Sequence, residues 1–357
     1  MSEALFTGAK ETRSEPELPP PLEPQLRSTG RYVPGAALQA AVEVALLLGQ
    51  PLLVTGEPGT GKSTLARALA YERFQSRYLE MQVKSTSARD DLLYRIDDVR
   101  RFRDAQLRRE NPMLNYLELR PFGEAIVRAC GPDAQLLDRS GRNLTGGEAF
   151  LDDMLGPHRL PGPPTARLLL PNAPEWTGPE RWVVLIDEID KAPRDTPNDL
   201  LEEFEKLAFA MPELGLRVAP SSGDAAIRPV VIVTSNSEKS LPHAFLRRCA
   251  YHHIPFPSDS ELRTIIAERL GELNMAPRLL GQLLALFEQF RKQMRQRPGT
   301  AELLQWLKRA DEDEELVEAA DRPSRAERLK RLVCIIAKDS QDQDTANARI
   351  DAWARGE

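Results

Sequence analysis

Short runs that are wholly apolar alternate along the first 257 residues with longer segments of helical pattern. Two of these runs, residues 183–186 and 230–233, are apolar at every position. Such runs are typical of strands that are covered on both faces, as in a parallel sheet flanked by helices. The predicted strands lie at residues 51–55, 78–83, 182–186, 230–234 and 251–256. We therefore expect an α/β domain over residues 31–257.

Helical patterns surround these strands and take over after Pro257. An Ala/Leu/Val-rich helix is predicted over residues 35–48, with Gly49 as its C-terminal cap, and a second over residues 63–74. Beyond Pro257, helical patterns continue to the C-terminus without a convincing strand. Leu279, Leu283, Leu286 and Phe287 share one face at i, i+4, i+7 and i+8. Residues 258–357 are expected to form a smaller all-helical domain, with the acidic run at residues 311–315 as a solvated turn.

Residues 1–30 differ from the rest in being polar and rich in proline. A segment of this composition buries too little apolar surface to offset its ordering entropy, so we interpret it as a flexible leader.

The most specific motif is GEPGTGKS at residues 56–63, a full match to the pattern G-x-x-x-x-G-K-[ST]. Its glycines let backbone N–H groups turn around an anion, and the helix that follows adds its positive N-terminal end. Lys62 is expected to reach the β- and γ-phosphates, and Ser63 to ligate Mg²⁺. The alternative is a chance glycine turn before a helix. The predicted nucleotide-binding residues are Gly56, Glu57, Pro58, Gly59, Thr60, Gly61, Lys62, Ser63, Thr64 and Asp187.

Asp187 and Glu188 stand at the end of the apolar strand at residues 182–186. Acids at the carboxyl end of a buried parallel strand face the crevice in which α/β sheets bind ligands. We expect Asp187 to hold Mg²⁺ through its water, together with Ser63, and Glu188 to polarise the attacking water. The alternative is that both are solvated acids at a strand end.

Two further candidates follow along the chain. Asn236 comes after the strand at residues 230–234, where it could bond the γ-phosphate and the attacking water, or merely shape the turn. Arg247 and Arg248 close a short helix, where basic residues are favoured by the helix dipole. Their functional interpretation is that Arg248 is an arginine finger for a neighbouring subunit's nucleotide, with Arg247 as a second contact.

Composition narrows the class of protein. The formal net charge of −6 argues against a surface that coats nucleic acid, and no apolar run is long enough to cross a membrane. No secretory signal is visible, and the odd number of three cysteines has no metal-ligand spacing. The four histidines also lack zinc-site spacing. A cytoplasmic protein is expected.

The order of these motifs resembles the AAA+ ATPases. The segments RYVP at residues 31–34, PLLVTGEPGTGK at 51–62, LIDEIDKA at 185–192 and LPHAFLRR at 241–248 are similar to the MoxR-like, dynein-related branch. This resemblance implies an ATPase that uses ATP and Mg²⁺, a helical lid, and a homo-oligomer, usually a hexameric ring, with sites between subunits. It also implies chaperone-like remodelling of a partner, often one with a von Willebrand factor A domain. Binding to nucleic acid or membrane is not expected.

The sequence departs from that branch in two places. The interval between Lys62 and Asp187 is long, and the excess at about residues 101–180 is either a functional decoration of one ring face, including hairpins near the pore, or disordered padding. Ala301 stands where the lid of such proteins usually offers an arginine to the γ-phosphate. Arg295 or Arg297 could substitute for it.

Two other functions remain open at this stage. One is a motor resembling the McrB-like GTPases of nucleic-acid restriction or defence. The other is a switch that binds nucleotide for assembly without hydrolysing it. The phosphate loop contacts only phosphates, so it does not distinguish ATP from GTP.

Overall fold

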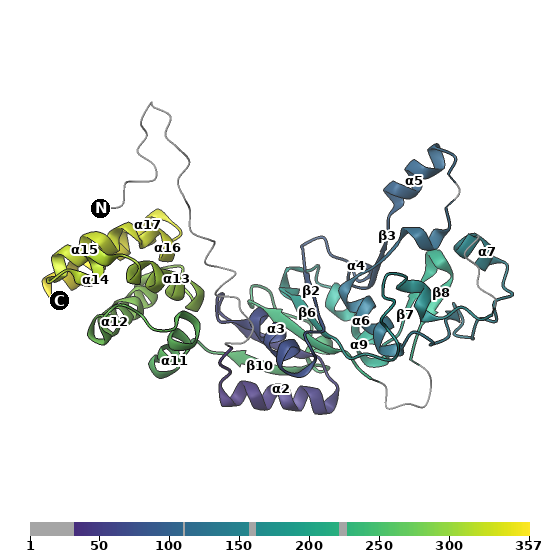
Figure 1. The fold of residues 1–357 in the computed structure, drawn as a ribbon, viewed down its shortest axis with the longest axis horizontal. Coiled ribbons are helices and arrows are strands. Elements are labelled where there is room, and N and C mark those ends of the chain that lie inside the picture. Colours follow the sequence, from purple (N-terminus) through teal and green to yellow (C-terminus); the bar gives the residue numbers. More distant parts are fainter. Residues whose placement is uncertain (1–31, 110, 157–161, 221–226) are drawn as a thin grey trace.

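The protein is described by a computed structural model that covers residues 32–109, 111–156, 162–220 and 227–357. The predicted leader at residues 1–30 and Arg31 lie outside the described residues. Figure 1 shows three parts side by side. A C-terminal group of helices lies at one end, a sheet with its helices in the middle, and a group of inserted elements at the other end.

A five-stranded sheet forms the centre of the molecule, and each pair of neighbouring strands runs parallel. Its strands in spatial order are β10 (Ala250–Ile254), β1 (Leu52–Gly56), β9 (Val230–Ser235), β6 (Val183–Asp187) and β2 (Tyr78–Gln82). The sheet confirms the predicted α/β class, and each predicted strand is present to within a residue or two at either end. Because all five strands point the same way, the polar residues that follow them gather at one edge.

Helices cover both faces of this sheet, which explains the wholly apolar strands. One face packs against α2 (Ala36–Leu48) and α3 (Lys62–Arg73), and its core includes Val183 and Leu185. The other face, with Val184 and Ile186, packs against α6 (Pro121–Cys130) and α9 (Leu201–Lys206). Successive strand residues point to opposite faces, so both sets must be apolar.

The two helices predicted from the N-terminal pattern are present. α2 ends where Gly49 adopts φ 62°, in the left-handed region that a glycine cap enters without a steric penalty. The helix α6 begins at Pro121, directly after residues 117–119, which pair as a strand. Proline suits the first turn of a helix, since its missing N–H would have no partner there.

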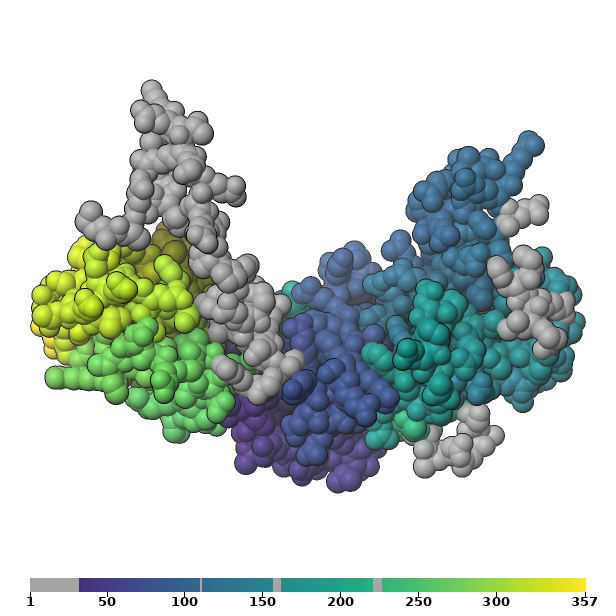
Figure 2. Space-filling model, viewed as in Figure 1, coloured from purple at the N-terminus to yellow at the C-terminus, as the bar shows by residue number. Residues whose placement is uncertain are grey.

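The inserted elements form two small sheets beyond α6. In the first, β3 and β4 pair antiparallel and carry α5, which projects from the body (Figure 2). In the second, β8 lies between β5 and β7. The elements between β2 and β6 are α4 (Asp90–Leu93), β3 (Tyr94–Ile96), α5 (Asp98–Gln106), η2 (Met113–Tyr116), β4 (Leu117–Leu119), α6, β5 (Leu137–Asp138), α7 (Phe150–Leu155) and η4 (Ala166–Leu169). Those between β6 and β9 are η5 (Ile189–Lys191), α8 (Thr196–Asp199), α9, β7 (Phe209–Met211), η6 (Pro212–Leu214) and β8 (Leu216–Val218).

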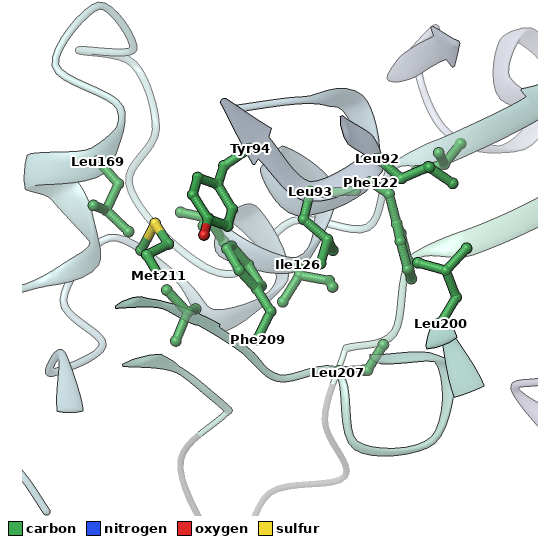
Figure 3. Close-up of a cluster of buried hydrophobic side chains, with 14 of the residues drawn as sticks. Leu92, Leu93, Tyr94, Phe122, Ile126, Leu169, Leu200, Leu207, Phe209 and Met211 are labelled. Atoms are coloured by element: carbon green, nitrogen blue, oxygen red, sulfur yellow. The ribbon is translucent and has the colours of Figure 1, made fainter. Parts of the chain in front are cut away.

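A shared apolar cluster joins these insertions to the sheet domain (Figure 3). Its aromatic members Tyr94, Phe122 and Phe209 come from β3, α6 and β7. Ile126 and Met211 lie in the same cluster and are fully buried. Tyr94 and Phe209 stack with ring centroids 6.3 Å apart. The backbones of α6 and α4 approach so closely that a Cβ on Gly123 would overlap the Leu93 carbonyl oxygen.

The C-terminal part, residues 258–357, consists of helices that enclose a second core. Leu279, Leu283, Leu286 and Phe287 are all buried in it, as their spacing predicts. The helices are α11 (Asp259–Leu270), α12 (Pro277–Gln293), α13 (Thr300–Asp311), α14 (Glu314–Glu318), α15 (Arg322–Arg331), α16 (Val333–Ile336) and α17 (Ser340–Arg355), preceded by α10 (His243–Leu246) in the sheet domain. No helix among the described residues is long and apolar enough to cross a bilayer.

The expectation that residues 311–315 form only a solvated turn is wrong for Asp311. This residue ends α13 and is 3% exposed. Its carboxylate accepts bonds from the Met275 backbone N–H at 2.8 Å and from Asn274 at 3.2 Å. Buried carboxylates need such partners, and these tie the segment before α12 to the end of α13.

Candidate nucleotide site

The phosphate loop connects β1 to α3 with the backbone that the motif requires. Gly59 and Gly61 have φ values of 77° and 88°, in the left-handed region that favours glycine. Lys62 is the first residue of α3, and its Nζ donates to the carbonyl oxygens of Gly56 and Glu57, both at 2.9 Å. The lysine therefore lies inside the loop, with carbonyl oxygens in the place that phosphate oxygens could take.

Lys62 is buried, and four acids surround it. Burial lowers the pKa of Lys62 below its usual value, although Asp187, Asp190, Glu188 and Glu57 act in the opposite direction. A buried cation that faces a cavity is a strong attractor for an anion, because less water screens it.

Asp187 joins the loop to the two central strands. Its Oδ1 accepts a hydrogen bond from the Ser63 hydroxyl at 2.8 Å and another from the Thr234 hydroxyl at 2.5 Å. Hydroxyl and carboxylate oxygens are the ligands that Mg²⁺ prefers, and few protein ligands are needed when phosphates and waters complete the shell. The chemistry of these residues thus fits Mg²⁺, which Ser63 and Asp187 would hold.

Glu188 has an unusual backbone and a crowded carboxylate. Its φ is 60°, which is uncommon for a residue with a Cβ, and its N–H donates to Thr234 Oγ1 at 2.9 Å. The carboxylate accepts from Asn236 Nδ2 at 3.1 Å, from Gln82 Nε2 at 2.9 Å and from Lys191 Nζ at 2.6 Å. Three donors from three separate segments therefore hold one acid in place.

The pKa of Glu188 reflects this environment. Partial burial by itself raises the pKa, but the hydrogen bonds from Lys191 and Gln82 and the Lys191 charge outweigh it, so the pKa is lower than usual. The acid is thus ionised near neutral pH, as a residue that polarises water must be.

Asp190 positions the loop that follows β9. It is 3% exposed, and it accepts backbone N–H bonds from Asn236 at 3.4 Å and from Glu238 at 3.0 Å. These bonds fix the loop after β9, which carries Asn236 to Glu188.

A cavity of about 760 Å³ lies between the phosphate loop and the C-terminal helices. Its size is within the usual range for small-molecule sites. One end is lined by polar residues of the loop and the strand ends, and the other by the N-terminal connection and the helical domain. The lining includes Lys62, Ser63, Thr64, Asp187, Glu188 and Asn236 at the first end and Tyr32, Val33, Pro34, Ile265, Arg269 and Leu304 at the second.

Arg247 and Arg248 do not line this cavity. Arg248 is 38% exposed, pairs with Glu205 of α9 and donates to the Ala244 carbonyl at 3.2 Å. Arg247 is exposed. Within one chain, the structure therefore separates both arginines from the other candidate residues.

Ala301 does line the cavity, at the start of α13. Neither of its possible substitutes does: Arg295 donates to Gln341, and Arg297 lies 3.7 Å from Glu57. The arginine of the helical domain in the lining is Arg269 on α11, which the sequence did not single out.

Gln82 and Thr234 are the other residues of the site that the sequence did not single out. Gln82 lies opposite Asp187 in the β2–β6 register, so the order of strands brings it to Glu188. No short motif marks such a residue, because its position depends on which strands are neighbours. Thr234 could have been noted as the polar end of an apolar strand.

A match to a known protein family covers the strands and loops that form this site. Residues 51–249 match the family model described as AAA domain (dynein-related subfamily), a range that covers more than half of the chain and contains Lys62, Glu188 and Asn236. The chain belongs to the dynein-related subfamily of AAA domains.

One solved structure, a "putative ATPase" from Cytophaga hutchinsonii ATCC 33406, is 13% identical, with a TM-score of 0.35, over 94% of this chain and 89% of that one. No curated protein matches the chain.

Proposed function

We propose that this AAA protein binds ATP with Mg²⁺ and hydrolyses it, as a motor of the MoxR type. The observation that carries the proposal is the carboxylate of Glu188, held by Asn236, Gln82 and Lys191 beside the Ser63–Asp187 pair. A switch that only binds nucleotide needs no oriented acid at this position. Mg²⁺, when bound by Ser63 and Asp187, would neutralise charge on the phosphates.

Each residue has a distinct task in this proposal. Lys62 exchanges its two carbonyl partners for phosphate oxygens, which are better acceptors for a cation. Glu188 polarises the attacking water, and Asn236 links the water and the γ-phosphate to it. Arg248, with Arg247, supplies the positive charge from a neighbouring copy in a ring, after Arg248 has left Glu205.

The mechanical task is the part that depends most on resemblance. A hexameric ring of MoxR type would remodel or activate a partner protein, such as one with a von Willebrand factor A domain. The inserted elements project away from the sheet domain, as a surface for a partner would (Figure 1).

Phosphate release from purified protein tests the enzymatic part. Wild type should hydrolyse ATP, while Glu188→Gln should lower kcat by about 10²–10⁴-fold and keep nucleotide affinity. Asp199→Asn, which changes an exposed acid on α8, is the matched control. Turnover unchanged in Glu188→Gln would contradict the assignment of the acid.

Mass photometry without nucleotide and with ADP, ATP or GTP tests assembly in the same samples. A ring that forms with ATP, and loses hydrolysis but not assembly in Arg248→Ala, supports a site shared between subunits. Hydrolysis of GTP in preference to ATP would instead favour the McrB-like alternative.

A further inference from the structure

The phosphate loop is attached to the C-terminal helical domain at its tip. The Glu57 carboxylate lies 2.5 Å from Arg291 of α12 and 3.7 Å from Arg297. Next to this pair the two backbones touch. A Cβ on Gly299 would overlap the Pro58 carbonyl oxygen, and a Cβ on Gly59 would lie 3.4 Å from the Gly299 Cα. The first turn of the loop and the start of α13 therefore form one packed unit.

Arg291 is the centre of this junction. Its side chain is 10% exposed, and its guanidinium carbon lies 3.4 Å from the centroid of the Phe256 ring. The guanidinium also donates to the Pro298 carbonyl, just before α13. Phe256 belongs to the connection between β10 and α11, so one arginine contacts this connection, the approach to α13 and the phosphate loop. Stacking and a planar set of donors are what arginine provides and lysine does not.

Glu57 contacts both the helical domain and the lysine of the phosphate loop. Its side chain binds Arg291, while its backbone carbonyl accepts from Lys62 Nζ at 2.9 Å. Lys62 must leave that carbonyl to reach a phosphate. Glu57 is thus both the residue whose carbonyl Lys62 leaves and the residue whose carboxylate binds the helical domain.

The cavity requires the two domains to stay together. Its lining takes residues from both, including Lys62 on one side and Ala301 and Leu304 on the other. Ala301 has only a methyl group, which cannot report the charge of a γ-phosphate. The helical domain can therefore be related to the nucleotide through Arg269 in the lining or through the junction at the tip of the phosphate loop.

We infer that Glu57 and Arg291 are positioning residues that hold the helical domain beside the nucleotide cavity and couple this domain to the nucleotide through the phosphate loop. This inference rests on the proposed function, because it assumes a nucleotide in the cavity. The pair acts from outside the cavity lining, to which the helical domain contributes Ala301 and Arg269.

Binding of ADP to the full chain tests the pair. Glu57→Gln and Arg291→Met should each raise the Kd for ADP by about fivefold or more. The Kd of the double variant should be no higher than that of the single variant with the higher Kd, because both changes remove the same contact. Lys292→Met removes a cation one residue away that is 68% exposed and pairs with Glu288, and it should change the Kd less than about twofold. Thermal unfolding checks that each variant is folded. If Arg291→Met does not fold, Arg291→Lys, which keeps the charge, is measured in its place.

Hydrogen exchange distinguishes coupling from a merely structural role, because a structural role would leave the protection by bound ADP unchanged. In wild type, ADP should slow exchange over residues 294–303, whereas in Glu57→Gln at saturating ADP this protection should be lost. Wild-type affinity and protection in both variants would overturn the inference and leave the proposed function intact. A wild type that binds no nucleotide would overturn both.

Discussion

The nucleotide site and the inserted elements lie at opposite sides of the same sheet domain and are built in different ways. In the site, polar side chains stand at the ends of strands and touch across short distances, as Ser63, Asp187 and Thr234 do. In the inserted region, apolar side chains that are far apart in sequence, such as Tyr94 and Phe209, meet in one core (Figure 3).

The two regions differ in what they require of the amino-acid sequence. Phosphate binding needs particular residue types at fixed offsets from a strand end, so local motifs encode it. The inserted core needs only apolar side chains of suitable volume, and many arrangements of such residues are possible. Changes in the site should therefore abolish activity and spare stability, and changes in the inserted core should do the reverse.

The largest effect is expected for Phe122→Ala in the core that the inserted elements share with the sheet domain. Phe122 is completely buried and packs 5.0 Å from the Phe204 ring centroid. Its loss should lower the free energy of unfolding by about 3–5 kcal/mol, through lost burial and the cavity left behind. Denaturant unfolding measures this, and a loss below about 1 kcal/mol would show that the core repacks freely.

Lys62→Ala is expected to affect binding more than folding. It removes the charge that faces the cavity, so ATP and ADP affinity should fall by about 10- to 100-fold. The thermal midpoint should stay near that of wild type, because Lys62 bonds only two loop carbonyls in the free protein. Titration with a fluorescent nucleotide provides the measurement. A large loss of stability without a change in affinity would contradict the separation of the two regions.

Lys191→Met is a milder change inside the site. Lys191 lowers the pKa of Glu188, so its removal should raise that pKa and move the acid limb of the kcat profile to higher pH. A depressed carboxylate pKa stabilises the fold above the unfolded pKa, and that contribution is lost as the pH falls through the folded value. In Lys191→Met, the contribution of Glu188 to the stability of the fold that is lost at acid pH should be smaller than in wild type. A pH–rate profile identical to that of wild type would show that the ion pair does not control the acid.

The smallest effect is expected for Phe102→Ala on α5, the exposed counterpart of Phe122→Ala. Phe102 is 66% exposed, so the free energy of unfolding should change by less than about 0.5 kcal/mol. The same denaturant measurement applies. A loss comparable to that of Phe122→Ala would mean that α5 packs against another part of the protein or another copy.

The amino-acid sequence by itself determined the class of sheet, the phosphate loop and the acids at the end of β6. These features are local: a strand covered on both faces must be apolar throughout, and an anion-binding turn requires glycine at left-handed positions. The C-terminal helices could also be predicted, because buried positions such as Leu283 and Phe287 repeat with the helical period.

Only the tertiary structure decided which distant residues complete the site. Strand order brings Gln82 to Glu188, and the packing of the helical domain brings Arg291 to Glu57. The antiparallel pairing of β3 with β4, and of β7 with β8, was also beyond the sequence pattern, because those strands have only three residues each. Contacts of this kind depend on chain segments that meet in space, and no periodicity along the chain records which segments will meet.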